Sequence, residues 1–412
     1  MRNPIITRRA CIAAMGTAAA ALTLGGCSAG SGTTSTDSTT FSNVEDKPAN
    51  SLRPTADQQT KIQNLLDKMT LEQKIGQLFI VTPEELTGVD DATAAGQTTH
   101  DALATYPVGG LCYFAKNITG ADQLRTMISN TKTYCSQVGA GIAPFISVDE
   151  EGGSRVARVA NSGYFDVKQF PDMAEIGAAG DTAQAANVGT TIGNYLRDIG
   201  FNVDFAPDAD VLTNPNNQVI GQRAFSSDAN VAAEMVAAEV KAMTATGTLP
   251  CIKHFPGHGD TEGDSHTGAV YATRTREQME SCELLPFKAG IEAGCPLVMV
   301  GHIETPNFAA DGLPASLSPT MIGDVLRGQL GFEGVIVSDS FSMGAITENY
   351  AGDDAAVRFI KAGGDVILMP SDLPVAYNGL LSAVKAGSIS TDRIDESVAR
   401  VLTAKLTAGL IE

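Results

Sequence analysis

The residues best suited to chemistry lie in one short stretch of the chain, residues 253–266. This stretch reads Lys-His-Phe-Pro-Gly-His-Gly-Asp-Thr-Glu-Gly-Asp-Ser-His and holds three of the five histidines of the protein. Its last acid and its last imidazole, Asp264 and His266, are two positions apart, so in an extended or looped segment the carboxylate can reach the ring. Such a carboxylate orients the imidazole and favours its protonated form. Because an imidazole titrates near neutrality, this pair predicts general acid and general base catalysis.

Two other interpretations of this stretch stay open. It could be a solvated glycine-rich loop with incidental histidines, or His254, His258 and His266 could bind a metal ion. A Pro-Gly pair separates the first two histidines, so they cannot share a helix face as the ligands of an H-E-x-x-H motif do. We therefore expect no metal site here.

A second carboxylate ends an apolar run elsewhere in the chain. Asp339 follows residues 334–338, and a helix-like segment, 342–346, comes next. One role for an aspartate at this position is to cap that helix. Another is to attack an anomeric carbon and form a covalent glycosyl intermediate, provided that a proton donor faces it. From the residues alone, both roles stay open.

The elements that must position these groups alternate along the chain. The sequence predicts eight strands, at 75–82, 108–114, 144–149, 202–206, 248–254, 297–302, 335–339 and 366–369. Amphipathic stretches lie between most of them, including 183–198, 231–246 and 276–293. The strands are apolar almost throughout, which is typical of a parallel sheet buried on both faces. Eight such units favour an α/β fold with a single (β/α)8 TIM-type barrel over an open doubly wound sheet.

Polar side chains gather where these strands end. Four strands finish in dense polar or ionisable clusters, at 149–153, 253–259, 301–304 and 338–340. The carboxyl ends of barrel strands converge on one face, where the active sites of such barrels sit. We therefore expect these clusters to meet around one pocket, with His302 and Glu304 only lining it.

The 253–266 motif resembles the signature of family 3 glycoside hydrolases, in particular of their β-N-acetylglucosaminidase branch. The likeness covers nearly the whole body and includes MTLEQKIGQ at 69–77, DEEGG at 149–153, IGQRAF at 220–225 and SDSFSM at 338–343. It implies a TIM-type barrel, catalysis without a cofactor, and two-step retention of the anomeric configuration.

By motif position, the resemblance implies that Asp339 is the nucleophile, His266 the general acid and base, and Asp264 its partner. It also implies that five residues hold the sugar hydroxyl groups: Asp149, Arg158, Arg223, Lys253 and His254. A histidine in place of the usual acid/base carboxylate would repel an incoming anion less, so phosphorolysis in competition with hydrolysis is a hypothesis.

Three positions need comment against the family pattern. Ser154 is inserted before Arg155, so Arg155 can take the place of Arg158. Arg223 could instead brace a loop through a carboxylate. Ser340 stands where many relatives have a second Asp, which leaves the nucleophile untouched.

The N-terminal region predicts export. Residues 1–26 have a basic start, an Ala-rich apolar stretch and then Leu-Gly-Gly before Cys27, which resembles a lipoprotein signal peptide with Cys27 as the lipidated residue. A single transmembrane anchor is the alternative, and Arg8-Arg9 leaves twin-arginine export open. Residues 27–54 are rich in Ser and Thr and predict a flexible tether, so the catalytic barrel is expected at 55–412.

The composition excludes other classes of protein. The formal net charge is −19 and no cluster of Lys and Arg occurs, which argues against nucleic acid as a partner. With 43% hydrophobic residues, the chain is neither disordered nor a polytopic membrane protein. The five cysteines of the body match no zinc spacing, so we expect buried thiols and at most one or two disulfides.

The sequence thus predicts an exo-acting β-N-acetylhexosaminidase that is anchored by lipid outside the cytoplasmic membrane. We expect a monomer that removes terminal N-acetylglucosamine from wall-derived muropeptides or other glycans. A family 3 β-glucosidase or xylosidase is one alternative, but such relatives take their acid/base carboxylate from a second domain that we do not expect here. A solute-binding lipoprotein is the other, and it would have no use for Asp339 together with the Asp264–His266 pair.

Overall fold

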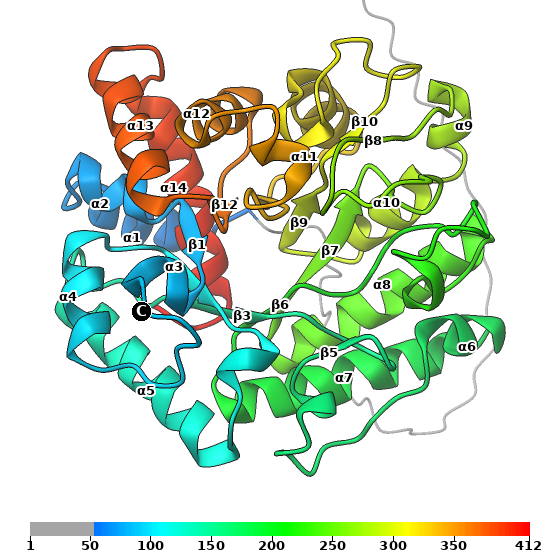
Figure 1. Ribbon diagram of the computed structural model, residues 1–412, viewed down its shortest axis with the longest axis horizontal. Helices are drawn as coiled ribbons and strands as arrows, with labels where there is room; N and C mark the ends of the chain where they lie inside the picture. The colour runs from blue at the N-terminus through cyan, green and yellow to red at the C-terminus, as the bar shows by residue number, and fades with distance from the viewer. Residues whose placement is uncertain (1–52) are drawn as a thin grey trace, which may run out of the picture. The chain divides into compact units, whose positions relative to one another are not determined.

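The computed structural model describes residues 53–412, in which eight parallel strands form one sheet in the order β11-β9-β7-β6-β3-β2-β1-β12. The sheet closes where β11 meets β12, through the bridge between Val337 and Val366 and a 2.9 Å hydrogen bond from the Ser338 N–H to the Val366 carbonyl. Helices surround this nearly closed barrel (Figure 1). The predicted α/β fold with a TIM-type barrel is confirmed.

Each predicted strand range overlaps one barrel strand. The strands are β1 (Phe79–Val81), β2 (Gly110–Cys112), β3 (Phe145–Val148), β6 (Val203–Asp204), β7 (Leu249–Phe255), β9 (Leu297–Val300), β11 (Val335–Ser338) and β12 (Ile367–Leu368). Most are shorter than predicted. The first range starts too early because Ile75 is a buried residue of helix α2, and polarity alone cannot tell such a residue from the start of a strand.

The helices follow the strands in the order expected of a barrel. They are α1 (Ala56–Leu66), α2 (Leu71–Gly76), α3 (Pro83–Thr87), α4 (Gln97–Thr105), α5 (Ala121–Gln137), α6 (Met173–Ala178), α7 (Thr182–Ile199), α8 (Ala229–Thr246), α9 (Arg276–Glu280), α10 (Leu284–Glu292), a π-helix (Thr320–Gln329), α11 (Gly344–Thr347), α12 (Gly352–Ala362), α13 (Leu373–Lys385) and α14 (Thr391–Thr407). The predicted helix at 276–293 is two helices, α9 and α10. Pro286 explains the break, because it is tolerated in the first turn of α10 but not inside one continuous helix.

In most strands, alternate residues face two different apolar cores. In β1, Ile80 belongs to the core inside the barrel, whereas Phe79 and Val81 belong to the core between the strands and the helices. Residues of the C-terminal helix α14, Val401 and Ala404, complete the inner core. This burial on both faces explains why the strand sequences are apolar throughout.

Two small sheets extend the carboxyl-terminal side of the barrel. One is the antiparallel pair β4 (Glu150–Gly152) and β5 (Val156–Ala157), which follows β3. The other is the parallel pair β8 (Val270–Tyr271) and β10 (Ile303–Glu304), whose strands follow β7 and β9. Both lie among the connections that surround the strand ends.

The predicted signal peptide, most of the predicted tether and Cys27 lie outside the described residues. Within residues 53–412, no helix combines the length and the apolar character needed to cross a membrane. The five cysteines of this part are free thiols, with Cys282 partly exposed and the other four buried.

Candidate active site

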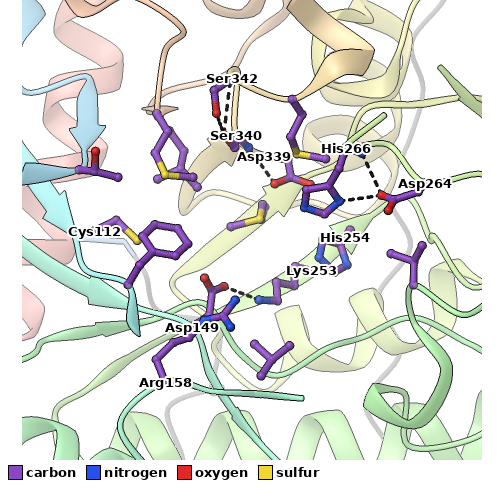
Figure 2. Close-up of a pocket in the computed structure, with 18 of the residues that line it drawn as sticks. Cys112, Asp149, Arg158, Lys253, His254, Asp264, His266, Asp339, Ser340 and Ser342 are labelled. Atoms are coloured by element: carbon purple, nitrogen blue, oxygen red, sulfur yellow. Dashed lines mark hydrogen bonds and ion pairs between the residues drawn. The ribbon is translucent and has the colours of Figure 1, made fainter. Parts of the chain in front are cut away.

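A pocket of about 930 Å³ lies at the carboxyl ends of the barrel strands (Figure 2). Its lining includes all eight predicted catalytic and sugar-binding residues: Asp149, Arg158, Arg223, Lys253, His254, Asp264, His266 and Asp339. These residues lie up to 190 positions apart in the chain, from 149 to 339. The barrel therefore brings the separate strand-end clusters to one place, as the strand pattern predicts.

Asp339 directly follows β11 and faces this pocket. Its carboxylate accepts a 2.7 Å hydrogen bond from the backbone N–H of Ser340. Helix α11 begins later, at Gly344, with Met343 as its N-cap, so Asp339 does not cap that helix. Burial alone would raise the pKa of Asp339, but His254, His302 and the Ser340 N–H outweigh it and hold the pKa below its ordinary value. The group is thus an ionised carboxylate, as a nucleophile must be.

Asp264 and His266 form a hydrogen-bonded pair in the loop between β7 and β8. Nδ1 of His266 lies 2.7 Å from Oδ1 of Asp264, which also accepts the backbone N–H of His266 at 2.9 Å. Because a carboxylate only accepts, Nδ1 carries the proton and Nε2 is left for a substrate. Slight burial raises the pKa of Asp264, but the contacts with His266 lower it by more than burial raises it. The pKa of Asp264 therefore lies below its usual value. The predicted partnership is present.

Lys253 occupies the floor of the pocket between two acids. Its Nζ lies 2.7 Å from both Asp149 and Glu151, and only 3% of the lysine side chain is exposed. Burial would lower the pKa of Lys253, yet the two carboxylates raise it above its usual value, so the ammonium keeps its charge. Sequence reasoning gave no role to Glu151, although it stands in the 149–153 cluster.

Arg223 is held by the same buried acid. Its guanidinium makes a bidentate ion pair with Glu151, at 2.8 and 2.7 Å, and its Nη2 lies 3.4 Å from Nε2 of His254. The Arg223 side chain therefore both pairs with the Glu151 carboxylate and lines the pocket. A direct contact of Arg223 with sugar stays a prediction.

His254 is oriented by an acid that sequence reasoning missed. Nδ1 of His254 lies 2.8 Å from Oδ2 of Asp210, which leaves Nε2 on the Arg223 side. Burial and the positive charge of Arg223 lower the pKa of His254 to about 4, so the ring is neutral at neutral pH. The signal for Asp210 was present, because an Asp-Ala-Asp run follows the fourth strand closely.

Arg158, rather than Arg155, has a guanidinium group without a hydrogen bond to another described residue. The Arg155 guanidinium donates to the backbone carbonyl of Gln218 at 2.5 Å. The Arg158 guanidinium stacks at 5.9 Å from the centre of the Phe114 ring, and its buried Nε has no hydrogen-bond partner among the described residues. Arg158 is therefore better placed to donate to a ligand, although both arginines line the pocket.

One part of the pocket wall is apolar. It is formed by Cys112, Phe114, Met299, Met343, Leu368 and Met369. These residues come from four separate segments, and only Met343 belongs to a quoted motif, so sequence reasoning could not assemble them. The pocket is consequently amphipathic, with charged groups on one side and thioethers and a ring on the other.

His302 and Glu304 correct one expectation. They line a neighbouring cavity of about 340 Å³ instead of the pocket that contains Asp339. His302 is used internally, since its ring nitrogens contact Ser316 Oγ at 2.8 Å and the Ser340 carbonyl at 2.9 Å. The expectation was wrong because the buried ring points towards the backbone that follows Asp339.

The described residues contain one group that could hold a metal ion: Asp208, Asp210 and His254, with ligand atoms within 4.8 Å of one another. Arg223 already lies 3.6 Å from Asp208, and Asp210 already accepts from the backbone N–H of His258 at 2.6 Å. The guanidinium of Arg223 thus places a positive charge beside this acidic pair, although burial still raises the pKa of both Asp208 and Asp210. The three histidines of the sequence motif do not converge, because His258 contacts Thr261 and Ser265 instead.

Comparison with known proteins decides the family. Residues 70–404 match the model of the glycosyl hydrolase family 3 N terminal domain. The chain belongs to glycoside hydrolase family 3. The resemblance seen in the sequence motifs is therefore confirmed, and the barrel and its strand-end pocket are those of a family 3 glycoside hydrolase.

Relatives of this family 3 chain include two proteins named beta-hexosaminidase. Beta-hexosaminidase A of Pseudoalteromonas piscicida is 33% identical over 329 residues, which cover 74% of this chain and 54% of that protein. Beta-hexosaminidase LpqI of Mycobacterium tuberculosis is 31% identical over 344 residues, which cover 81% of this chain and 82% of that protein. The family 3 chain thus spans about half the length of the first relative and most of the second.

A solved structure shows the same fold. The family 3 β-N-acetylglucosaminidase from Paenibacillus sp. str. FPU-7 superposes with a TM-score of 0.76 at 35% sequence identity. The match covers 83% of this family 3 chain and 63% of that structure. It therefore includes almost the whole barrel.

Proposed function

We propose that this protein is an exo-acting, retaining β-N-acetylhexosaminidase. It would release terminal β-linked N-acetylglucosamine from wall-derived muropeptides or other glycans. The observation that carries this proposal is that an ionised carboxylate, Asp339, and an Asp–His pair, Asp264 and His266, line the same pocket. The names of the two relatives support a hexosaminide substrate, and that of the Paenibacillus structure, a β-N-acetylglucosaminidase, supports the choice of sugar.

The first chemical step follows from these positions. The Asp339 carboxylate attacks the anomeric carbon and forms a glycosyl ester, while His266 donates its Nε2 proton to the departing glycosidic oxygen. Asp264 holds the ring by Nδ1 and stabilises the imidazolium form that must exist before the transfer. The bond from the anomeric carbon to the aglycone breaks, and the aglycone leaves as a neutral alcohol.

The second step reverses these roles. His266, now neutral, takes a proton from water, and the resulting hydroxide equivalent attacks the anomeric carbon and releases Asp339. Two inversions at one carbon give net retention. The charged floor of the pocket, with Lys253 between Asp149 and Glu151, is suited to hydrogen bonds with the sugar hydroxyl groups.

The export of the protein is part of the same proposal. We propose that residues 1–26 direct export and that Cys27 is lipidated, which would anchor the catalytic body outside the cytoplasmic membrane. The sequence motif alone supports this. Replacement of Cys27 by Ala should move the protein from the membrane fraction to the soluble fraction, and an unchanged distribution would refute lipidation.

A panel of nitrophenyl glycosides tests the activity. The purified protein should hydrolyse the β-N-acetylglucosaminide with a kcat/KM at least about tenfold above those for the β-glucoside and the β-xyloside. Preference for a glucoside would favour the β-glucosidase alternative, and turnover of none would favour a binding protein. Asp339→Asn is the inactive control. Product analysis with and without phosphate separates hydrolysis from phosphorolysis.

A further inference from the structure

The loop that carries the catalytic pair is fixed by the residue between them. We call residues 256–269 the dyad loop. The side chains of His266 and Asp264 are 66% and 43% exposed, respectively, so they cannot hold the loop by packing. Ser265, in contrast, is only 2% exposed. Ser265 is the only buried residue within 262–269, so this distal part of the dyad loop is attached to the protein through Ser265 and its backbone.

The first attachment is internal to the dyad loop. Ser265 Oγ lies 3.2 Å from Nε2 of His258, which is itself 2% exposed. The other ring nitrogen of His258 lies 2.7 Å from Thr261 Oγ1, and its backbone N–H donates to Asp210 at 2.6 Å. The His258 ring therefore has partners on both nitrogens and cannot rotate freely, so it gives Ser265 a fixed anchor.

The second attachment comes from the segment that carries the nucleophile. The backbone N–H of Gly344 donates to the His266 carbonyl at 3.1 Å, and that of Ala345 donates to the Ser265 carbonyl at 3.2 Å. These N–H groups belong to the first turn of α11, where helical N–H groups lack partners within the helix. Gly344 follows Asp339 by five residues. The two halves of the catalytic machinery are thus joined by backbone hydrogen bonds.

Gly344 is also required sterically for this contact. A Cβ atom at residue 344 would lie 2.9 Å from the carbonyl oxygen of His266, 3.1 Å from the carbonyl carbon of Thr267 and 3.2 Å from the nitrogen of Gly268. All three are backbone atoms of the dyad loop, so no side-chain rotation can relieve the overlap. Any side chain at residue 344 must push the dyad loop away from the nucleophile segment.

We propose that Gly344 and Ser265 are positioning residues that hold His266 at the working distance from Asp339. The inference rests on the proposed function, since it gives His266 the role of acid. Neither residue touches the reacting atoms: the Ser265 hydroxyl is turned to His258, and Gly344 acts through its backbone. Loss of either attachment leaves the Asp339 carboxylate and the sugar-binding floor in place and displaces only the proton donor.

Two variants and two matched controls test this. Gly344→Ala adds the clashing methyl group, and Ser265→Ala removes the internal anchor. Gly323→Ala is the glycine control, because a Cβ there has no atom closer than 3.9 Å. Ser388→Ala is the serine control, because it removes one hydrogen bond, of 3.1 Å to the Ala383 carbonyl, far along the chain. Thermal unfolding checks that each variant folds.

The kinetic readout is kcat/KM over aryl N-acetylglucosaminides whose leaving groups differ in pKa. A displaced acid matters most where the leaving oxygen needs a proton. The kcat/KM of both variants should therefore fall by about tenfold or more for the substrate with the poorest leaving group, and by less than about threefold for the substrate with the best. In both controls, kcat/KM should depend on the pKa of the leaving group as it does in the wild type. A uniform loss over all leaving groups, or an unchanged dependence in both variants, would overturn the positioning role.

Hydrogen exchange supplies a readout that needs no activity. Peptides that cover residues 340–346 and 258–270 should exchange faster in both variants and not in the controls. Unchanged exchange in both variants would overturn the docking itself. If the wild type cleaves no N-acetylglucosaminide, the proposed function fails while the exchange result still decides the attachment. If Gly344→Ala does not fold, Ser265→Ala decides both readouts.

Discussion

Nδ1 of His266 donates to the carboxylate of Asp264 over 2.7 Å, in a loop whose backbone is hydrogen-bonded to the segment that follows Asp339. In the proposed mechanism, this histidine performs the task that a second carboxylate performs in most glycosidases. The proposed proton donor, His266, therefore lies on a different segment from Asp339, which follows β11, and its side chain can be removed without changing that carboxylate.

Removal of the donor should therefore affect substrates unequally. His266→Ala should lower kcat/KM for an N-acetylglucosaminide with a poor leaving group by about 10²-fold or more, and for an activated aryl glycoside far less. The comparison of the two substrates is the measurement. Equal losses on both would show that His266 is structural. Asp264→Asn should give a smaller loss of the same pattern, because the ring remains.

The pH profile should show the low pKa of the nucleophile. Asp339 must be ionised to attack, and its pKa lies below the ordinary carboxyl value of about 3.9. As the pH falls, Asp339 thus stays ionised at pH values where an ordinary carboxyl group is already protonated. The fall of kcat/KM on the acid side of the profile should therefore lie below about pH 4. Activity at pH 6 after a stay at each acid pH controls for unfolding. An acid limb near pH 5 or above would contradict the assignment.

A buried acid at the amino-terminal end of β12 should dominate local stability. Asp365 accepts from Arg327 at 2.5 Å, from Arg400 at 3.1 Å and from Ser397 at 2.6 Å. Asp365→Ala removes a fully buried acid and leaves the partly buried Arg327 and Arg400 without their partner, so the free energy of unfolding should fall by about 3–5 kcal/mol in denaturant titration. Asp354→Ala, which breaks an ion pair whose two side chains are each 46% exposed, should cost less than about 1 kcal/mol. Similar losses in both would refute this difference.

Lys405 should make stability depend on pH in the alkaline range. Its Nζ is buried against Gln77 and the Gly109 carbonyl, and burial lowers the pKa of Lys405 to about 7. The unfolded chain has an ordinary lysine pKa of about 10.4, so between these values it binds a proton that the folded chain does not. The free energy of unfolding should therefore rise from pH 7 to pH 9 more in the wild type than in Lys405→Met. Equal slopes would show that Lys405 stays charged.

The sequence predicted the barrel because its strands are buried on both faces and its polar clusters sit where strands end. Asp149, Lys253 and Asp339 could be placed from that pattern alone, since each follows or ends an apolar run. What the pattern could not show is pairing. Glu151 and Asp210 bind Arg223 and His254 only through the closed barrel, and no spacing rule connects residues 151 and 223.

The errors have physical causes of the same kind. His302 ends a predicted strand as Asp339 does, but its ring points to the Ser340 carbonyl. The position of a residue at a strand end does not fix where its side chain points beyond the last hydrogen bond of the sheet. The apolar part of the pocket wall could not be predicted, because the sequence does not distinguish a methionine or leucine that lines a pocket from one that packs in a core. Gly344 has no side chain that could react, so the sequence gives it no role. Only its close contact with the backbone of residues 266–268 indicates why a glycine is needed there.

The central claim is that Asp339 attacks the sugar, and covalent capture tests it most directly. A 5-fluoro-N-acetylglucosaminyl fluoride, which forms the glycosyl ester faster than it is hydrolysed, should add one sugar to the intact protein. Peptide mass spectrometry should place the sugar on Asp339, and Asp339→Asn should remain unlabelled. Asp372→Asn, a helix N-cap that Asn can replace, is the control and should be labelled like the wild type. A sugar on another carboxylate, or labelling that survives Asp339→Asn, would contradict the account.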